Sequence, residues 1–134
     1  HVYVAQVSLS NPAQCIKAFV EAEKYDGPSL IIADSHCIAH GIDMSKGVEM
    51  QRNAVKSGYN ILYRYNPALI DEGKNPLKID SREPSMPVID FMKSENRFRS
   101  VMKMFPERAK HLAELADTHV KRRYNFYKKL SSND

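Results

Sequence analysis

The fold class follows from residues 29–47, which read SLIIADSHCIAHGIDMSKG and join an all-apolar run to a polar loop. The apolar run is typical of a short strand that is buried on both faces of a parallel sheet. Asp43 or Ser45 is suited to begin a helix, which we expect to extend to about Ser57. A strand, a loop and a helix in this order predict an α/β fold with Cys37 in the loop after the strand.

Two further strands are expected around this stretch. Residues 1–9, HVYVAQVSL, alternate apolar and other side chains as a strand does, and they start without lead-in residues. We therefore expect the chain to be a piece of a longer polypeptide. A helix capped by Asn11 and ended by Gly27 should follow. With YNILYRY at 59–65 as a third strand, residues 1–65 predict a βαβαβ unit, a partial parallel sheet of about three strands with crossover helices.

Residues 66–134 have a different composition. Four prolines and Gly73 lie between positions 66 and 87, which indicates a long irregular wrapping segment with a short extended piece at PLKID. Two C-terminal helices are expected after it, one over residues 87–105 and one from Pro106 onward, each with an apolar stripe. We assign this region to the same domain as residues 1–65.

Composition restricts the class of protein. The chain has 134 residues, of which 43% are hydrophobic and 27% charged, as in ordinary globular domains. The longest apolar run, Leu30–Ala33, is far shorter than the roughly 20 residues of a membrane helix, so no membrane partner is expected. The two cysteines are too few for a disulfide framework.

The positive charge lies in the second part of the chain. The formal net charge is +4, and the segment VKRRYNFYKKL, residues 120–130, alternates basic and aromatic residues as some nucleic-acid-binding segments do. Basic residues near the C-terminus of a helix also offset the helix dipole. We favour this second explanation and expect no nucleic-acid partner.

Several roles are open for Cys37 on the residues alone. As a nucleophile it would need a base, but His36 is adjacent and points to the opposite face of an extended segment, whereas His40 could reach it. Cys37 and His40 have the spacing of half a zinc site, although a second pair is missing. Cys37 could also be a core residue, as we expect for Cys15, or one ligand of an iron–sulfur cluster completed by another part of the chain.

Longer motifs resemble one family. These are GPSLIIADSHCIAHGIDMSKG at 27–47, AVKSGYNILYRYNPALIDEGKNPLKIDS at 54–81, ENRFRS at 95–100 and PERAKHLAELA at 106–116. Together they strongly resemble the C-terminal end of pyruvate:ferredoxin (flavodoxin) oxidoreductase. The resemblance implies the second half of that enzyme's last domain, which holds thiamine diphosphate and the nearest 4Fe–4S cluster.

The resemblance also implies a reaction and a site. Members of this family decarboxylate pyruvate on thiamine diphosphate with Mg²⁺, transfer the acetyl group to coenzyme A and pass electrons through three 4Fe–4S clusters to ferredoxin or flavodoxin. The full enzyme is expected to be a homodimer in the cytoplasm, or in an anaerobic organelle of a eukaryote. By the resemblance, Cys37 is the fourth ligand of the cluster next to thiamine.

Other family features are missing from the 134 residues. The diphosphate-binding Gly-Asp-Gly run and the other three cluster cysteines have no match. We therefore carry over no catalytic or cofactor-binding residue, and expect the isolated chain to be inactive with no cofactor bound. The alternatives are a non-catalytic basic binding module and a small thiol enzyme that uses Cys37 and His40.

Overall fold

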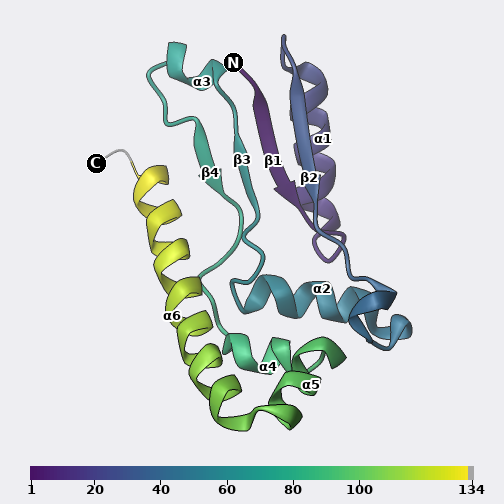
Figure 1. Ribbon diagram of the computed structural model, residues 1–134. Helices are drawn as coiled ribbons and strands as arrows, with labels where there is room; N and C mark the ends of the chain where they lie inside the picture. The colour runs from purple at the N-terminus through teal and green to yellow at the C-terminus, as the bar shows by residue number, and fades with distance from the viewer. Residues whose placement is uncertain (133–134) are drawn as a thin grey trace.

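The computed structural model describes residues 1–132 as an α/β structure built on one mixed sheet (Figure 1). The sheet has four strands, in the order β2-β1-β3-β4. Its strands are β1 (Tyr3–Val7), β2 (Ser29–Ala33), β3 (Tyr63–Tyr65) and β4 (Leu77–Ile79). The α/β class predicted from the sequence is confirmed, and so is the extended piece at PLKID, which forms β4.

The direction of the third strand differs from the prediction. β1 and β2 are parallel, with Ala5 opposite Ile31, but β3 runs antiparallel to β1 and β4 antiparallel to β3. A parallel β3 would need a helix that crosses the face of the sheet. Instead α2 (Gly47–Lys56) lies beyond the end of the sheet and packs against α4, so the chain simply turns back into β3 (Figure 1).

The first helix forms as its sequence signals predict. α1 (Pro12–Lys24) has proline in its first turn, and Asn11 Oδ1 accepts a hydrogen bond from the Gln14 N–H at 3.2 Å. Its buried Ala18 packs against Tyr3, Ala5 and Val7 of β1 to make the main core cluster. α1 thereby covers one face of the parallel strand pair.

Short helical turns connect β2 to α2. A 3₁₀ turn at Ile38–His40 is followed by a second one at Met44–Lys46. Asp43 Oδ1 accepts hydrogen bonds from the Ser45 N–H at 3.0 Å and the Ser45 hydroxyl at 2.7 Å. These bonds lower the pKa of Asp43 and confirm it as the residue that begins the helical region.

The C-terminal region is more regular than expected at one place and less regular at another. The segment expected to be irregular contains α3 (Ala68–Asp71) as well as β4. The single helix predicted over residues 87–105 is wrong, because the structure has α4 (Val88–Met92) and α5 (Asn96–Met104) with a break between them. The predicted restart at Pro106 is confirmed by α6 (Pro106–Ser131), which packs against α4, α5 and β4.

A buried ion cluster joins α1 to the second half of the sheet. Arg64 donates two hydrogen bonds to Asp80, both of 2.8 Å, and also pairs with Glu21 of α1. The Tyr3 hydroxyl donates to Glu21 at 3.1 Å, and burial together with this carboxylate raises the pKa of Tyr3. The cluster provides partners for an arginine that is only 5% exposed.

Apolar side chains remain uncovered on two surfaces, on the edge strand β2 and on α1. β2 was predicted to be buried on both faces, but it is an edge strand whose Leu30 and Ile32 are 52% and 40% exposed. The stripe on α1 is also open, with Ile16 65% and Phe19 54% exposed. Edge strands and apolar stripes of this kind are normally covered by further elements. Among residues 1–132, no helix is long and apolar enough to cross a membrane.

Candidate functional site

The loop after β2 carries the cysteine that the sequence singled out. We call residues 34–41 the cysteine loop; it leaves the sheet at the carboxyl ends of the parallel strands, where α/β proteins commonly build their sites. A cavity of about 250 Å³ lies beside it. The cavity is lined by Asp34, Ser35, His36, His40, Met50, Gln51, Ala54, Tyr59, Phe91, Glu95 and Arg97.

Cys37 itself is an unpaired, half-buried cysteine. Its backbone is extended, at φ −134° and ψ 138°, and its carbonyl accepts a hydrogen bond from the His40 N–H at 3.0 Å. His36 lines the cavity but Cys37 does not, in agreement with the expectation that neighbouring side chains of an extended segment face opposite sides. The loop therefore separates its thiol from the polar cavity.

The two histidines are engaged away from the thiol. Gln51 Nε2 donates to His36 Nδ1 at 3.0 Å, and the Ser8 hydroxyl donates to Gln51 Oε1 at 3.0 Å. His40 Nε2 lies 3.3 Å from Arg97 Nη1, while its Nδ1 lies 3.9 Å from Glu95 Oε1. Both nitrogens of His40 thus face partners other than Cys37, which does not favour a cysteine–histidine nucleophile.

A complete metal site is not formed by the described part of the chain. No group of three or more His, Cys, Asp or Glu side chains within residues 1–132 is arranged to hold a metal ion. Cys15 lies on α1, packed against its core cluster. A free thiol remains the donor that iron–sulfur clusters use, so Cys37 fits the part of one ligand among several.

The sequence reasoning missed the side chains that hold the cysteine loop. Gln51 lies in the helix expected to extend to about Ser57, with Met44, Val48 and Val55 on the same face, and the sequence assigns it no role in the site, yet it is buried and bonds to both Ser8 and His36. Glu95 and Arg97 were placed inside a continuous helix, whereas Glu95 is a buried carboxylate at a helix break. A polar residue within an apolar stripe was the one local signal that could have identified Gln51.

A second polar chain closes the carboxyl edge of the sheet. The buried Asn60 donates to Asp34 Oδ2 at 3.3 Å and accepts a hydrogen bond from the Gln6 amide of β1. The first residue of the cysteine loop is therefore tied to the segment that leads into β3.

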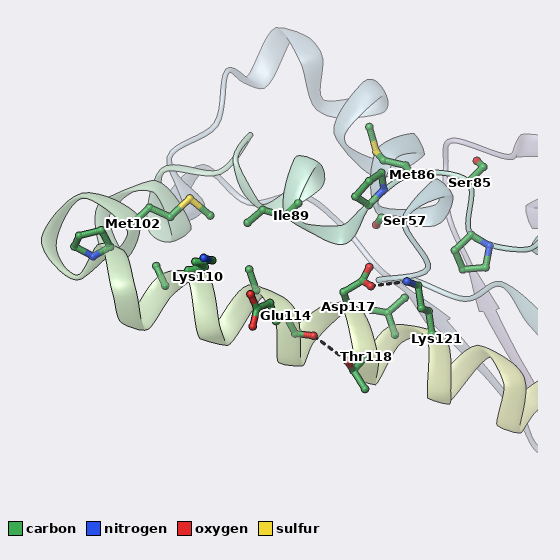
Figure 2. Close-up of a pocket in the computed structure, with 16 residues that line it drawn as sticks. Ser57, Ser85, Met86, Ile89, Met102, Lys110, Glu114, Asp117, Thr118 and Lys121 are labelled. Atoms are coloured by element: carbon green, nitrogen blue, oxygen red, sulfur yellow. Dashed lines mark hydrogen bonds and ion pairs between the residues drawn. The ribbon is translucent and has the colours of Figure 1, made fainter.

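A larger groove lies elsewhere and has a different character. A groove of about 920 Å³ runs between α6 and the segment 84–89, with prolines, alanines, Met86 and Met102 among its lining residues. Figure 2 shows Glu114 and Asp117 along the side of α6 that borders it, with Asp117 paired to Lys121 at 2.6 Å. Among the residues that line the groove there is no histidine or cysteine, so it does not contain a cysteine–histidine pair of the kind considered for the loop.

Comparison with known proteins gives one consistent result. The chain is 51% identical over 133 residues to a pyruvate-flavodoxin oxidoreductase of Nostoc sp., covering 98% of this chain and 11% of that protein. It is 48% identical over 132 residues to the pyruvate:ferredoxin oxidoreductase of Moorella thermoacetica, again with 98% and 11% covered. A mitochondrial pyruvate dehydrogenase [NADP(+)] of Euglena gracilis is 41% identical over 132 residues, which is 97% of this chain and 7% of that protein.

These relatives are much longer than the chain. It spans about a tenth of the length of the curated oxidoreductases that it matches, and no family model matches it. The resemblance identified from the four motifs is confirmed by identities of this size over nearly the whole chain.

Proposed function

We propose that this chain, whose sequence matches pyruvate-flavodoxin and pyruvate:ferredoxin oxidoreductases over almost its whole length, works as a cluster-ligating and packing segment of such an enzyme. Its role is to supply one thiolate, from Cys37, to the 4Fe–4S cluster nearest the thiamine diphosphate. The other ligands and the whole diphosphate site come from the remainder of the parent polypeptide.

One observation carries the proposal. Cys37 is a free thiol on a loop at the carboxyl edge of a parallel strand pair, inside the motif that resembles the oxidoreductase family. A cysteine thiolate is the usual protein ligand of a cubane cluster, and its ligands need not be close in sequence. When bound, such a cluster takes up and releases single electrons, which suits the stepwise oxidation of pyruvate in the parent enzyme.

The remaining cofactors fit this chain less well. Thiamine diphosphate and Mg²⁺ require a phosphate-binding loop and oxygen ligands, and residues 1–132 contain no grouped acidic ligands for a metal ion. We assign the binding of diphosphate, pyruvate and coenzyme A, and the docking of flavodoxin or ferredoxin, to the full enzyme and to no residue of this segment.

The test is Cys37→Ala in the full-length parent enzyme. We expect iron content to fall by up to about a third, because one of three clusters loses a thiolate ligand. Pyruvate-dependent reduction of the electron carrier should fall steeply, while thiamine diphosphate binding persists. Cys15→Ala is the matched control, because that thiol packs beside the core cluster of α1 and its loss should leave the iron content unchanged.

One result would contradict the ligand role of Cys37. Full iron content together with full carrier reduction in Cys37→Ala would show that this thiol is not a ligand. The thiol-enzyme alternative would instead be supported by rapid alkylation of Cys37 at neutral pH in the absence of any cluster.

A further inference from the structure

The cysteine loop has little regular structure of its own to fix the position of Cys37. Residues 34–37 belong to no helix or strand, and the 3₁₀ turn that follows covers only Ile38–His40. Ile38 is 75% exposed, so apolar packing does not anchor that turn within the chain. A ligand on such a loop needs support from other elements to be held in one place.

One support acts on the residue before the cysteine. The His36 imidazole accepts a hydrogen bond from Gln51 of α2, and Gln51 in turn accepts one from Ser8 at the end of β1. Gln51 and Ser8 are only 3% and 1% exposed, so the chain of bonds is buried. The ring also lies tightly over Gly47, where an added Cβ would come within 2.2 Å of His36 Nε2.

A second support acts on the residue three positions after the cysteine. His40 lies between Arg97 and Glu95, and Arg97 Nε also donates to Glu95 Oε2 at 2.5 Å. Only 5% of the Glu95 side chain is exposed. The Asn96 N–H donates to the Gly41 carbonyl at 3.2 Å, and Gly41 has a φ of +66°, a conformation that favours glycine.

From these contacts we infer that His36 and His40 are positioning residues for the Cys37 thiolate, an inference that rests on the proposed function. Each histidine ties one side of the cysteine loop to a different helix, His36 to α2 and His40 to the start of α5. The contacts span 15 and 57 residues of sequence, so they fix the loop against elements that are distant from it in the sequence.

His36 and His40 lie close to Cys37 in the sequence, but neither contacts it through a ring nitrogen. A positioning role accounts for this arrangement. Buried side-chain networks that orient a metal ligand typically affect metal affinity by about 10- to 100-fold when they are removed. They act on the geometry of the ligand, so their loss should change the properties of the cluster and not only the stability of the fold.

The experiment compares histidine variants of the full-length parent enzyme. His36→Leu and His40→Leu remove the contacts, whereas His36→Asn keeps an acceptor oxygen close to the position of Nδ1 for the Gln51 amide. His111→Leu is the matched control, because that histidine is exposed on α6. The measurements are the rate of iron release to an anaerobic chelator and the electron paramagnetic resonance spectrum of the reduced enzyme.

For His36→Leu and His40→Leu we expect one cluster's share of the iron to be released roughly tenfold faster, with a changed resonance from that cluster. His36→Asn should return the spectrum toward that of the unmodified enzyme, and His111→Leu should not alter it. Wild-type release and spectra in both leucine variants would overturn the inference. Equally faster release from every cluster would also overturn it, because that result indicates general unfolding.

Cys37→Ala, measured in the same series, distinguishes a failure of the proposed function from a failure of the positioning role. If Cys37→Ala keeps its full iron content, the proposed function fails and the inference fails with it. If Cys37→Ala loses its cluster while both leucine variants keep theirs unchanged, the proposed function holds and only the positioning role is wrong.

Discussion

At the scale of single residues, Asp80 links the stability of the sheet to pH. Burial favours its neutral form, but hydrogen bonds from Arg64 and Gln14 and the charge of Arg64 more than offset burial and lower the pKa of Asp80. A carboxyl group with a lowered pKa binds its proton less readily in the folded state. Its contribution to the free energy of unfolding is therefore complete above about pH 4 and is lost as the pH falls through the lowered value.

We expect Asp80→Asn to lower the free energy of unfolding of the chain by about 3 kcal/mol at neutral pH, because the variant leaves a buried arginine with Glu21 as its remaining partner. The variant should also lose stability less steeply than the wild type between about pH 5 and pH 2. Urea unfolding across this range measures both effects. Asp117→Asn, which breaks the exposed pair with Lys121, should cost less than about 1 kcal/mol, and equal acid slopes in wild type and Asp80→Asn would contradict the assignment.

At the scale of elements, the local signals predicted where helices begin better than where they stop or how strands pair. Asn11, Asp43 and Pro106 mark helix starts correctly, because capping and proline geometry act within one turn. The break between α4 and α5 lies at Glu95, which reaches His40 in the cysteine loop, and the reversal of β3 accompanies the packing of α2 against α4. Such long-range contacts are invisible to a reading of periodicity.

The same difference in range applies to the candidate site. Cys37 could be singled out as a candidate from the sequence because its loop follows an apolar run, but its proposed role as a ligand came from the resemblance to the oxidoreductase family. The partners of the flanking histidines could not be found in this way, because Gln51 lies 15 residues from His36 and Arg97 lies 57 residues from His40.

The long helix α6 is fastened to the turn after α2 by one arginine. Arg123 Nη2 donates to the carbonyls of Gly58 at 2.9 Å and Tyr59 at 2.5 Å, and an added Cβ at Gly58 would lie 2.8 Å from a methyl group of Val120. Close packing and charged hydrogen bonds therefore meet at the same point of contact.

We expect Arg123→Gln to destabilise the chain by about 2 kcal/mol, since hydrogen bonds to charged groups contribute roughly 1.5–3 kcal/mol. Amide hydrogen exchange should become faster in α6, because this contact holds the helix against the rest of the fold. The adjacent Arg122 is exposed, so Arg122→Gln should change neither quantity measurably. Equal exchange rates in the two variants would show that Arg123 does not hold α6 in place.

At the scale of the whole molecule, two uncovered apolar surfaces distinguish a segment from a self-sufficient domain. Ile31 of the edge strand packs against the core cluster under α1, so its neighbours Leu30 and Ile32 are exposed on the opposite face of the sheet, whereas the stripe on α1 is exposed on the side of the helix itself. The chain spans about a tenth of its oxidoreductase relatives, which leaves ample polypeptide to cover both surfaces in a full enzyme.

We expect the double variant Ile16→Gln/Phe19→Gln to have different effects in the isolated chain and in the full-length parent. In the isolated chain, both side chains are more than half exposed, so the change should reduce self-association and binding of an apolar dye without lowering the urea midpoint. In the full-length parent, the same change should reduce assembly or thermal stability, because there the stripe would be buried against other segments. Lys17→Gln, an exposed change on the same helix, should be neutral in both settings. If the double variant is neutral in the parent as well, α1 faces solvent in the full enzyme, and the exposed apolar side of the edge strand β2 is left to carry the contact with the remaining polypeptide.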